Sequence, residues 1–355
     1  AQLTPIPLKR IRLSSRAVPN KRFSRLRLKL AILGGGSCFA LSLARVANAD
    51  GHEVIGIGRS PLKVAFALEF FHPRRDYRYY QAHIVDAHEQ ALYFLDLFKP
   101  DWIVNFAAQG EGAVSHKREN WPWFYRTNVW GLSRLVACLA KRDSLSRFVH
   151  IGSSEVYGSV NAPAAESAAI RPTSIYAHSK AAFDRFLEMT HAIAGFPMNI
   201  IRPSNCYVKG QQLHRIIPRA LLCAATGRKL QLHGGGVAKK SYLHADDLSR
   251  AILRVAQDAP LGETYNCGPD EPSAIRDVVE RCAHFAGIPT ASFVEETGDR
   301  AGGQDGQYWL DSSKLKALGW KQEVDWDRGL ADTAAWVSAY KTELAACDAE
   351  FHLRP

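Results

Sequence analysis

The sequence lacks several features that would place it in a specialised class. No run of apolar residues reaches the ~18 that a membrane-spanning helix needs, so we expect no transmembrane segment. No CxxC or HExxH pair is present, so we expect no bound metal. The seven cysteines are scattered along the chain of 355 residues. An odd number of thiols without motif spacing is typical of a reducing compartment, which predicts a cytoplasmic protein.

The first 49 residues contain no Asp or Glu, and the first acidic residue is Asp50. Residues 1–30 hold nine lysines or arginines, and residues 31–355 hold 36 basic against 35 acidic residues. The positive charge therefore belongs to a basic N-terminal arm, residues 1–27, and the near-neutral remainder predicts no nucleic-acid binding. The arm has three readings: a flexible extension, a surface for phosphate or for an unknown partner, or an organelle-targeting peptide.

Strand-like and helix-like segments alternate along the first two thirds of the chain. This alternation predicts an α/β fold with a Rossmann-type, doubly wound parallel sheet. Beyond residue 207, short helices alternate with segments rich in Gly and Pro, which predicts a smaller C-terminal α/β lobe for the substrate. Strands are predicted at 26–33, 52–58, 101–108, 147–154 and 199–207, and helices at 40–51, 86–98 and 127–142.

These patterns suggest a division of the chain into an arm and two interlocked units. The dinucleotide-binding domain is predicted at 28–200 with about 237–265. The substrate lobe is predicted at about 201–236 with 266–345.

Three glycines, Gly34 to Gly36, separate the first predicted strand from the first helix. A tight glycine turn at this place lets backbone N–H groups approach a pyrophosphate at a helix N-terminus. Ser37 and Ala40 occupy the places of the second and third spaced glycines, so Ser37 brings a side chain near the phosphates. A purely structural strand–helix turn is the alternative.

The second predicted strand ends in Arg59 and Ser60 rather than in an acidic residue. An acid at this position usually binds the ribose 2′-hydroxyl of NAD, whereas an Arg suits a 2′-phosphate. The sequence therefore favours NADP, with NAD as a possible cofactor. An Arg on a solvated loop is the alternative.

The stretch HIGSSEVYG…YAHSK, residues 150–180, carries the candidate chemistry. Tyr176 and Lys180 are four residues apart, so they share one face of a helix, and the ammonium lowers the pKa of the phenol. Such a Tyr accepts a proton from a sugar hydroxyl while hydride leaves the same carbon. Ser153, Ser154 and Glu155 follow the strand before it.

Taken together, these motifs resemble the extended short-chain dehydrogenase/reductase family, in its nucleotide-sugar epimerase/dehydratase branch. The resemblance covers roughly residues 28–340 and implies a nucleotide-diphosphate sugar as substrate. It also implies a homodimer, because two helices of the region around WPWFYRTNVW, residues 121–130, pair across subunits in the family. The matching segments include ILGGGSCFA, HEVIGIGRS, KPDWIVNFAAQ, YRTNVWG, GSSEVYG, YAHSK, IRPSNCYVKGQ, KKSYLHADDL and GETYNCG.

Within this branch Glu155 favours a 4,6-dehydratase, since epimerases usually lack an acid there. The Ser-Ser-Glu form is most similar to GDP-mannose 4,6-dehydratases, whereas the closing segment DRAGG…YWLDSSKLKALGW is more similar to dTDP-glucose 4,6-dehydratases. The implied reaction is oxidation at C4, loss of water across C5 and C6, and return of hydride to C6. An epimerase, decarboxylase or reductase of the same family is one alternative, and a non-catalytic protein that binds NADP(H) is another.

The resemblance also implies roles for individual residues. Tyr176, Lys180, Ser153, Ser154 and Glu155 would be catalytic. Residues expected to contact the cofactor are Gly34, Ser37, Cys38, Phe39, Arg59, Ser60, Ile84, Ala107, Ala108, Thr127, Tyr176, Lys180 and Cys206, with His83 in place of an Asp that reads adenine. Residues expected to contact the substrate are Ser153, Asn205, Lys240, Asn266 and Arg300.

Overall fold

The computed structural model describes residues 27–62, 77–110, 113–142, 144–298 and 306–347. Most of the predicted basic arm, residues 1–26, and the predicted substrate residue Arg300 lie outside this part of the chain. None of the helices in the described ranges has the length and apolar character that crossing a membrane requires.

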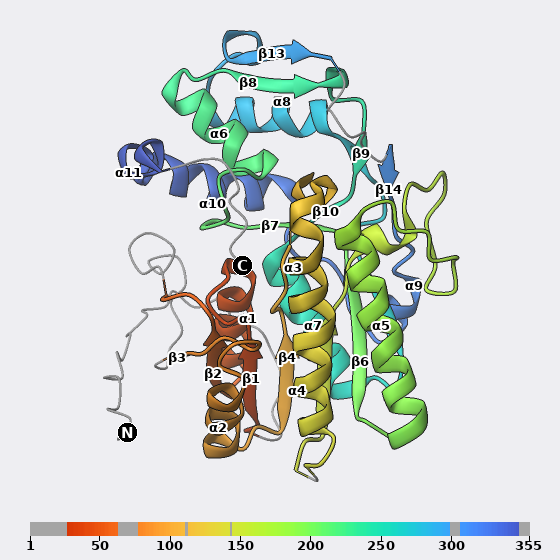
Figure 1. Cartoon of the computed structure of the whole chain (residues 1–355). Coiled ribbons are helices and arrows are strands. Elements are labelled where there is room, and N and C mark those ends of the chain that lie inside the picture. The colour runs from red at the N-terminus through yellow and green to blue at the C-terminus, as the bar shows by residue number, and fades with distance from the viewer. Residues whose placement is uncertain (1–26, 63–76, 111–112, 143, 299–305, 348–355) are drawn as a thin grey trace.

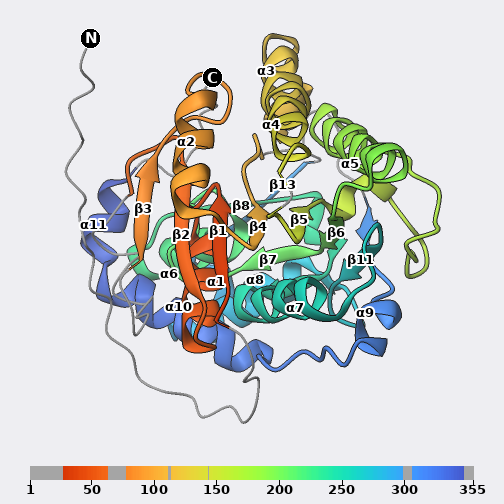
Figure 2. The ribbon, with the colours of Figure 1, turned by 90° about the horizontal axis from the view of Figure 1, so that it is seen from below.

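Seven parallel strands form one sheet in the order β3-β2-β1-β4-β5-β6-β11 (Figures 1 and 2). The chain moves outward from β1 to β3 and then continues with β4 on the other side of β1. This reversal creates the switch point at which doubly wound folds bind their ligands. The strands are β1 (Lys29–Leu33), β2 (Glu53–Gly58), β3 (Arg78–Gln81), β4 (Trp102–Asn105), β5 (Arg147–Ile151), β6 (Met198–Pro203) and β11 (Thr264–Cys267).

Helices cover both faces of the sheet, as Figure 2 shows. One face packs against α1 (Cys38–Ala49) and α7 (Ala245–Asp258). The other packs against α2 (His88–Phe98), α4 (Leu132–Leu139) and α5 (Ile175–Ala194). Apart from the edge strand β3, the strands are largely buried on both sides, which explains why their sequences are nearly continuous apolar runs.

The helix predicted at 127–142 begins earlier and is not uniform. It starts as α3 (Trp121–Tyr125), passes through a π-helical segment, η3 (Arg126–Gly131), and continues as α4. Pro122 stands in the first turn of α3, where a missing N–H is tolerated. At Gly131 an added Cβ would lie 2.5 Å from Val85, so the helix approaches the end of β3 closely. The sequence pattern gave no sign of the π-helical segment.

Two further details differ from the sequence prediction. The strand predicted at 199–207 divides at Ser204 into β6 and β7 (Asn205–Tyr207), and β7 pairs with β10 (Tyr242–His244) in a separate small sheet. The strand β3 was not predicted, because an edge strand with half-exposed side chains has a weak apolar pattern. The other four predicted strands are confirmed within a few residues.

A smaller lobe lies over the carboxyl edge of the sheet (Figure 1). Its core joins α6 (Ile216–Thr226), α8 (Ile275–Ala286) and α10 (Trp326–Ala339) with β8 (Leu230–His233) and β13 (Val294–Thr297). The chain leaves the large sheet after β6 and returns to it with α7 and β11. The remaining strands and α-helices are β9 (Lys239–Lys240), β12 (Ser273–Ala274), β14 (Gln307–Tyr308), α9 (Ser313–Ala317) and α11 (Lys341–Ala346). The short 3₁₀ helices are η1 (Ala113–His116), η2 (Arg118–Asn120), η4 (Ser154–Tyr157), η5 (Gly234–Gly236) and η6 (Thr290–Ser292).

A fully buried tyrosine directly before the edge strand explains one glycine of β2. The Tyr77 hydroxyl donates a 2.8 Å hydrogen bond to the carbonyl of Gly35, so β3 is tied to the glycine turn after β1. An added Cβ at Gly56 would overlap this hydroxyl. The position therefore needs a glycine because of the close approach of Tyr77.

We predict that Gly56→Ala lowers the free energy of unfolding by about 1–3 kcal/mol, the range for forced overpacking of a core. Urea unfolding followed by circular dichroism measures it. Gly298→Ala is the control, since its added Cβ meets no atom within 4 Å. An equal effect of the two substitutions would contradict the packing explanation.

Candidate active site

The glycine turn brings the ends of β1, β2 and β4 together at the switch point. The N–H groups of Gly34 and Gly35 donate to the carbonyl of Ile57 at 2.8 and 3.1 Å. Gly34 has φ +74°, and an added Cβ would lie 2.7 Å from the backbone nitrogen of Ala107. This bare backbone fits a pyrophosphate at the start of α1, as a dinucleotide cofactor requires.

Ser37 has a local structural role at this turn. It is the N-cap residue of α1, and its Oγ accepts a hydrogen bond from the N–H of Ala40 at 3.2 Å. The hydroxyl thus occupies one of the amide donors that a helix N-terminus otherwise leaves open. The next residue, Cys38, is buried, and burial raises the pKa of its thiol to about 12, so it is neutral near pH 7.

The end of β2 supplies the predicted adenosine side of the site. The carbonyls of Arg59 and Ser60 accept hydrogen bonds from Gln81 and from the Tyr79 hydroxyl, at 3.0 and 2.6 Å, so β3 fixes this loop. His83 accepts from the N–H groups two and three residues ahead, at 3.3 and 2.9 Å, much as an Asp does in a turn.

The predicted catalytic segment begins directly beyond β5. Ser153 caps η4, and its Oγ accepts from the N–H of Glu155 at 3.2 Å. Ser153 and Ser154 are buried, whereas Glu155 is half-buried. A half-buried carboxylate at the carboxyl end of a strand is well suited to exchange protons with a ligand.

Helix α5 carries the second half of the catalytic set. Its N-cap Ser174 accepts from the N–H of Ala177 at 3.1 Å, and Tyr176 follows in the first turn, where its ring meets Phe124 edge-on at 6.3 Å. One turn later, Lys180 Nζ donates a 2.5 Å hydrogen bond to the carbonyl of Ile151. This bond ties α5 to the end of β5, two residues before Ser153.

Burial changes the charge state of Lys180. Its side chain is 3% exposed, and this desolvation lowers the pKa of the ammonium to about 8, although the charge of Asp184 opposes the shift. The ammonium is therefore lost as the pH rises through about 8. Below that pH it can stabilise a phenolate on Tyr176.

The residues predicted to contact substrate are less uniform. Asn266 is fully buried, and its amide bonds to the Tyr157 hydroxyl and to the carbonyl of Ala164 at 2.9 and 2.8 Å. Lys240 is also buried, with Nζ 3.4 Å from the centre of the Tyr308 ring. Asn205 is half-buried in β7. Their contact with substrate stays a prediction.

The remaining predicted cofactor residues lie at or near the same edge of the sheet. Ala107 and Ala108 follow β4, Ile84 follows β3, and Cys206 is in β7. Phe39 is in the first turn of α1, and Thr127 is in η3. These positions agree with a common site, and the individual contacts stay predictions.

Several residues that sequence reasoning missed complete this region. Asn128 links the loop after β4 to α5, because its amide bonds to both backbone groups of Gln109 and to Ser179 Oγ. Arg215 reaches the carbonyl of Gly110 at 3.2 Å from the start of α6. An Asn inside a helix and a cation before a helix are weak signals by themselves, so the sequence gave little reason to select them.

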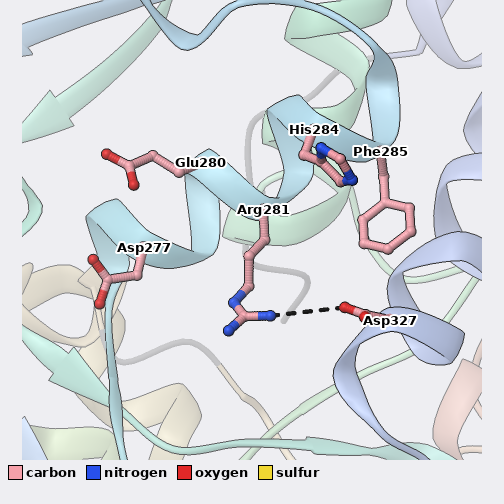
Figure 3. Close-up of a pocket in the computed structure, with 6 residues that line it drawn as sticks. All are labelled: Asp277, Glu280, Arg281, His284, Phe285 and Asp327. Atoms are coloured by element: carbon pink, nitrogen blue, oxygen red, sulfur yellow. Dashed lines mark ion pairs between the residues drawn. The ribbon is translucent and has the colours of Figure 1, made fainter.

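The lobe has a separate hollow of about 560 Å³ between α8 and α10 (Figure 3). Arg281 and Asp327 form an ion pair of 3.7 Å across it. Three of its six lining residues are acidic, which disfavours a nucleotide diphosphate, and none belongs to the predicted site. The lining residues are Asp277, Glu280, Arg281, His284, Phe285 and Asp327.

Comparison with known families agrees with this geometry. Residues 30–268 match the model of the NAD dependent epimerase/dehydratase family. The chain belongs to this family. It is accordingly an enzyme of the extended short-chain dehydrogenase/reductase type, and the predicted Rossmann-type fold is confirmed.

Relatives within the epimerase/dehydratase family cover most of the chain. A dTDP-D-glucose 4,6-dehydratase from Mus musculus is 29% identical over 318 residues, 87% of this chain and 88% of the mouse protein. A dTDP-glucose 4,6-dehydratase from Streptomyces griseus is 32% identical over 273 residues, 76% of this chain and 80% of its own. The structure of DesIV, the dTDP-glucose 4,6-dehydratase from Streptomyces venezuelae with NAD and TYD bound, superimposes with TM-score 0.79 and 28% identity, covering 89% of this chain and all of DesIV.

Proposed function

We propose that the chain is a nucleotide-sugar 4,6-dehydratase that uses NADP. The observation that carries this proposal is the half-buried carboxylate of Glu155, directly beyond β5 and beside the helix that bears Tyr176 and Lys180. Epimerisation at C4 needs the Tyr–Lys pair alone, whereas removal of water needs a further group that can take and return a proton. The dehydratase relatives support the same reading.

The first step belongs to Tyr176. As a phenolate it removes the proton from the sugar C4 hydroxyl, and the Lys180 ammonium stabilises that phenolate. The nicotinamide cofactor, when bound at the glycine turn, supplies the hydride acceptor at C4 and the hydride donor for C6. In this proposal Ser153, directly beyond β5, hydrogen-bonds the C4 oxygen.

The second step belongs to Glu155. A ketone at C4 makes the C5 proton acidic, so the Glu155 carboxylate removes it. The protonated Glu155 then gives a proton to the hydroxyl that leaves C6 as water, and a proton from solvent adds to C5 when hydride returns to C6. Ser154 stands where dTDP-glucose dehydratases have an acid, but a hydroxyl is too weak an acid for this step, so we assign both proton transfers to Glu155.

The preference for NADP rests on Arg59. It follows β2 at the place where an NAD-binding chain has a carboxylate, and its guanidinium can bind a 2′-phosphate with two hydrogen bonds. DesIV binds NAD, so this preference would distinguish the chain from that relative.

The seven cysteines are all free, which supports the cytoplasmic location expected above.

The proposal includes a homodimer formed through α3, α4 and α5. Large apolar side chains on α3, on α5 and on η3, which joins α3 to α4, are exposed, including Trp130 at 51% and Ile193 at 76%. The Tyr125 hydroxyl and His178 lie 2.5 Å apart, so the exposed stripes of α3 and α5 are neighbours. Apolar patches of this kind mark protein interfaces.

Substitution of the acid tests the dehydratase assignment. Glu155→Gln is expected to lower turnover about 10²–10⁴-fold, the usual contribution of a general acid–base group. Mass spectrometry of the sugar nucleotide measures it, with dTDP-glucose, GDP-mannose, UDP-glucose, CDP-glucose and UDP-N-acetylglucosamine as candidate substrates. Glu280→Gln, in the hollow of Figure 3, is the control. Isomeric products without loss of water would indicate an epimerase instead.

Substitution of Arg59 tests the cofactor preference. Arg59→Ala is expected to weaken NADP binding by about 10- to 100-fold, since charge-assisted hydrogen bonds contribute about 1.5–3 kcal/mol. NAD binding should change little, because the NAD ribose carries no phosphate. Fluorescence titration with both cofactors measures this, and Arg78→Ala, whose side chain pairs with Glu53, is the control. Equal losses for the two cofactors would contradict the assignment.

Sedimentation tests the dimer. The chain of 39.4 kDa is expected to sediment as a dimer, and Trp130→Glu is expected to shift it to a monomer, because burial of a charge disfavours the interface. Tyr93→Glu changes an equally exposed aromatic residue on α2 and should leave the dimer intact. A monomeric wild type would refute this part of the proposal.

A further inference from the structure

A buried layer of polar side chains lies beneath Lys180, and the mechanism above does not use it. His150 in β5 and Asp184 in α5 are 0% exposed, and Arg202 in β6 is 3% exposed. Ionisable groups are rarely buried without a partner or a purpose. The hydrogen bonds and distances among His150, Asp184 and Arg202 therefore indicate how these residues affect Lys180.

The hydrogen bonds of Asn105 determine the protonation of His150. The Oδ1 atom of Asn105 accepts from the N–H of Ala107 at 3.1 Å, so its Nδ2 is the donor to His150 Nδ1 at 3.0 Å. A neutral imidazole that accepts at Nδ1 carries its proton on Nε2. Burial, with the charges of Lys180 and Arg202, lowers the pKa of His150 well below its usual value, so the ring stays neutral.

The Nε2 atom of His150 stands between a cation and an anion. It lies 3.2 Å from Lys180 Nζ and 3.7 Å from Asp184 Oδ1. The other carboxylate oxygen of Asp184 accepts from Arg202 Nε at 2.9 Å, whereas Oδ1 is buried and has no hydrogen-bond partner among the described residues. The imidazole N–H therefore points toward a carboxylate oxygen that is otherwise unsatisfied.

We propose that Asp184 and His150 are positioning residues for Lys180: the buried carboxylate keeps the ammonium charged, and the neutral imidazole, with its proton on Nε2, holds that carboxylate in place. The inference rests on the proposed function for the role of the Tyr–Lys pair, but the charge of Lys180 does not depend on turnover. Without Asp184, burial alone would act on the lysine and drive it toward the neutral amine. A neutral amine cannot stabilise the phenolate of Tyr176.

The charged groups near Lys180 differ in how directly they act on it. Asp184 is the acidic group that opposes the desolvation of Lys180, and Arg202 shares its carboxylate. Glu188, one turn further along α5, reaches Arg202 at 4.0 Å and is more distant from the lysine. The charges that act on Lys180 and His150 are those of Asp184 and Arg202, besides the charge of Lys180 on His150. The other titratable groups on the elements packed here are Tyr176 and Glu188 on α5, and Glu155 and Tyr157 on η4.

The direct test is the pKa of Lys180 in the whole protein without substrate. Protein labelled with ¹³C at lysine Cε is titrated by NMR, and the Lys180 signal is identified by its loss in Lys180→Arg. We expect a pKa near 8 in the wild type and a value lower by roughly one unit or more in Asp184→Asn, because the favourable charge is gone. Glu188→Gln removes a charge from the same helix and should leave the value unchanged.

An Asp184→Asn variant with an unchanged Lys180 pKa would overturn the proposal. If that variant does not fold, ¹⁵N NMR of histidine in the wild type decides instead. A neutral ring with the proton on Nε2 between pH 5 and 8 supports the proposal, and a proton on Nδ1 or an imidazolium overturns it.

The pH profile of turnover separates a positioning role from a merely structural one. In Asp184→Asn the falling limb of kcat/KM should move to lower pH by the same amount as the lysine pKa, and Asp184→Glu should restore it. A loss of activity with no shift of the limb would contradict the proposal. If no sugar nucleotide is turned over at all, the proposed function is refuted. The NMR titration still measures the pKa of Lys180 and so still tests this inference.

Discussion

One buried ammonium joins the two halves of the candidate active site. Lys180 Nζ bonds to the carbonyl of Ile151, so α5, which carries Tyr176, is held against the end of β5, where Ser153 and Glu155 follow along the chain. Burial of an ammonium costs several kcal/mol unless its surroundings compensate. Here the carbonyl of Ile151 and the carboxylate of Asp184 supply that compensation, and His150 and Arg202 on the apolar strands β5 and β6 surround the carboxylate.

The same layer continues toward the lobe. Arg202 Nη1 donates to the Tyr157 hydroxyl at 2.9 Å, and that hydroxyl donates to Asn266 at the same distance. Asn266 in turn donates from its backbone to Glu166 at 2.7 Å. A continuous set of polar contacts thus runs from the catalytic lysine to β11, the last strand of the sheet. The Tyr–Lys pair and the predicted substrate residue Asn266 are thus connected through the same buried side chains.

The sequence predicted those parts of the molecule that depend on local pattern. Apolar runs identified four strands within a few residues, and the glycine turn after β1 identified the switch point. The Tyr176–Lys180 spacing identified one helix face. The edge strand β3 and the π-helical segment were missed, because the first is half-exposed and the second has no signature in the apolar pattern.

The support beneath the site was also beyond the reach of sequence reasoning. His150, Asp184 and Arg202 come from three separate elements, and only the packing of α5 on β5 and β6 brings them together. Each residue alone has an ordinary structural explanation. Ser37 is a local case: its hydroxyl caps α1, and its contact with the phosphates stays a prediction. Side-chain hydrogen bonds between distant segments are not encoded in spacing.

Isotope tracing of the reaction tests the central claim, that this site removes water from a nucleotide sugar. The protein is incubated in D₂O with the candidate sugar nucleotides and its cofactor, and the products are analysed by mass spectrometry and NMR. The account predicts loss of one water, one solvent deuterium at C5, and transfer of the C4 hydrogen to C6. A product that keeps its water and differs only in configuration at C4 would contradict it.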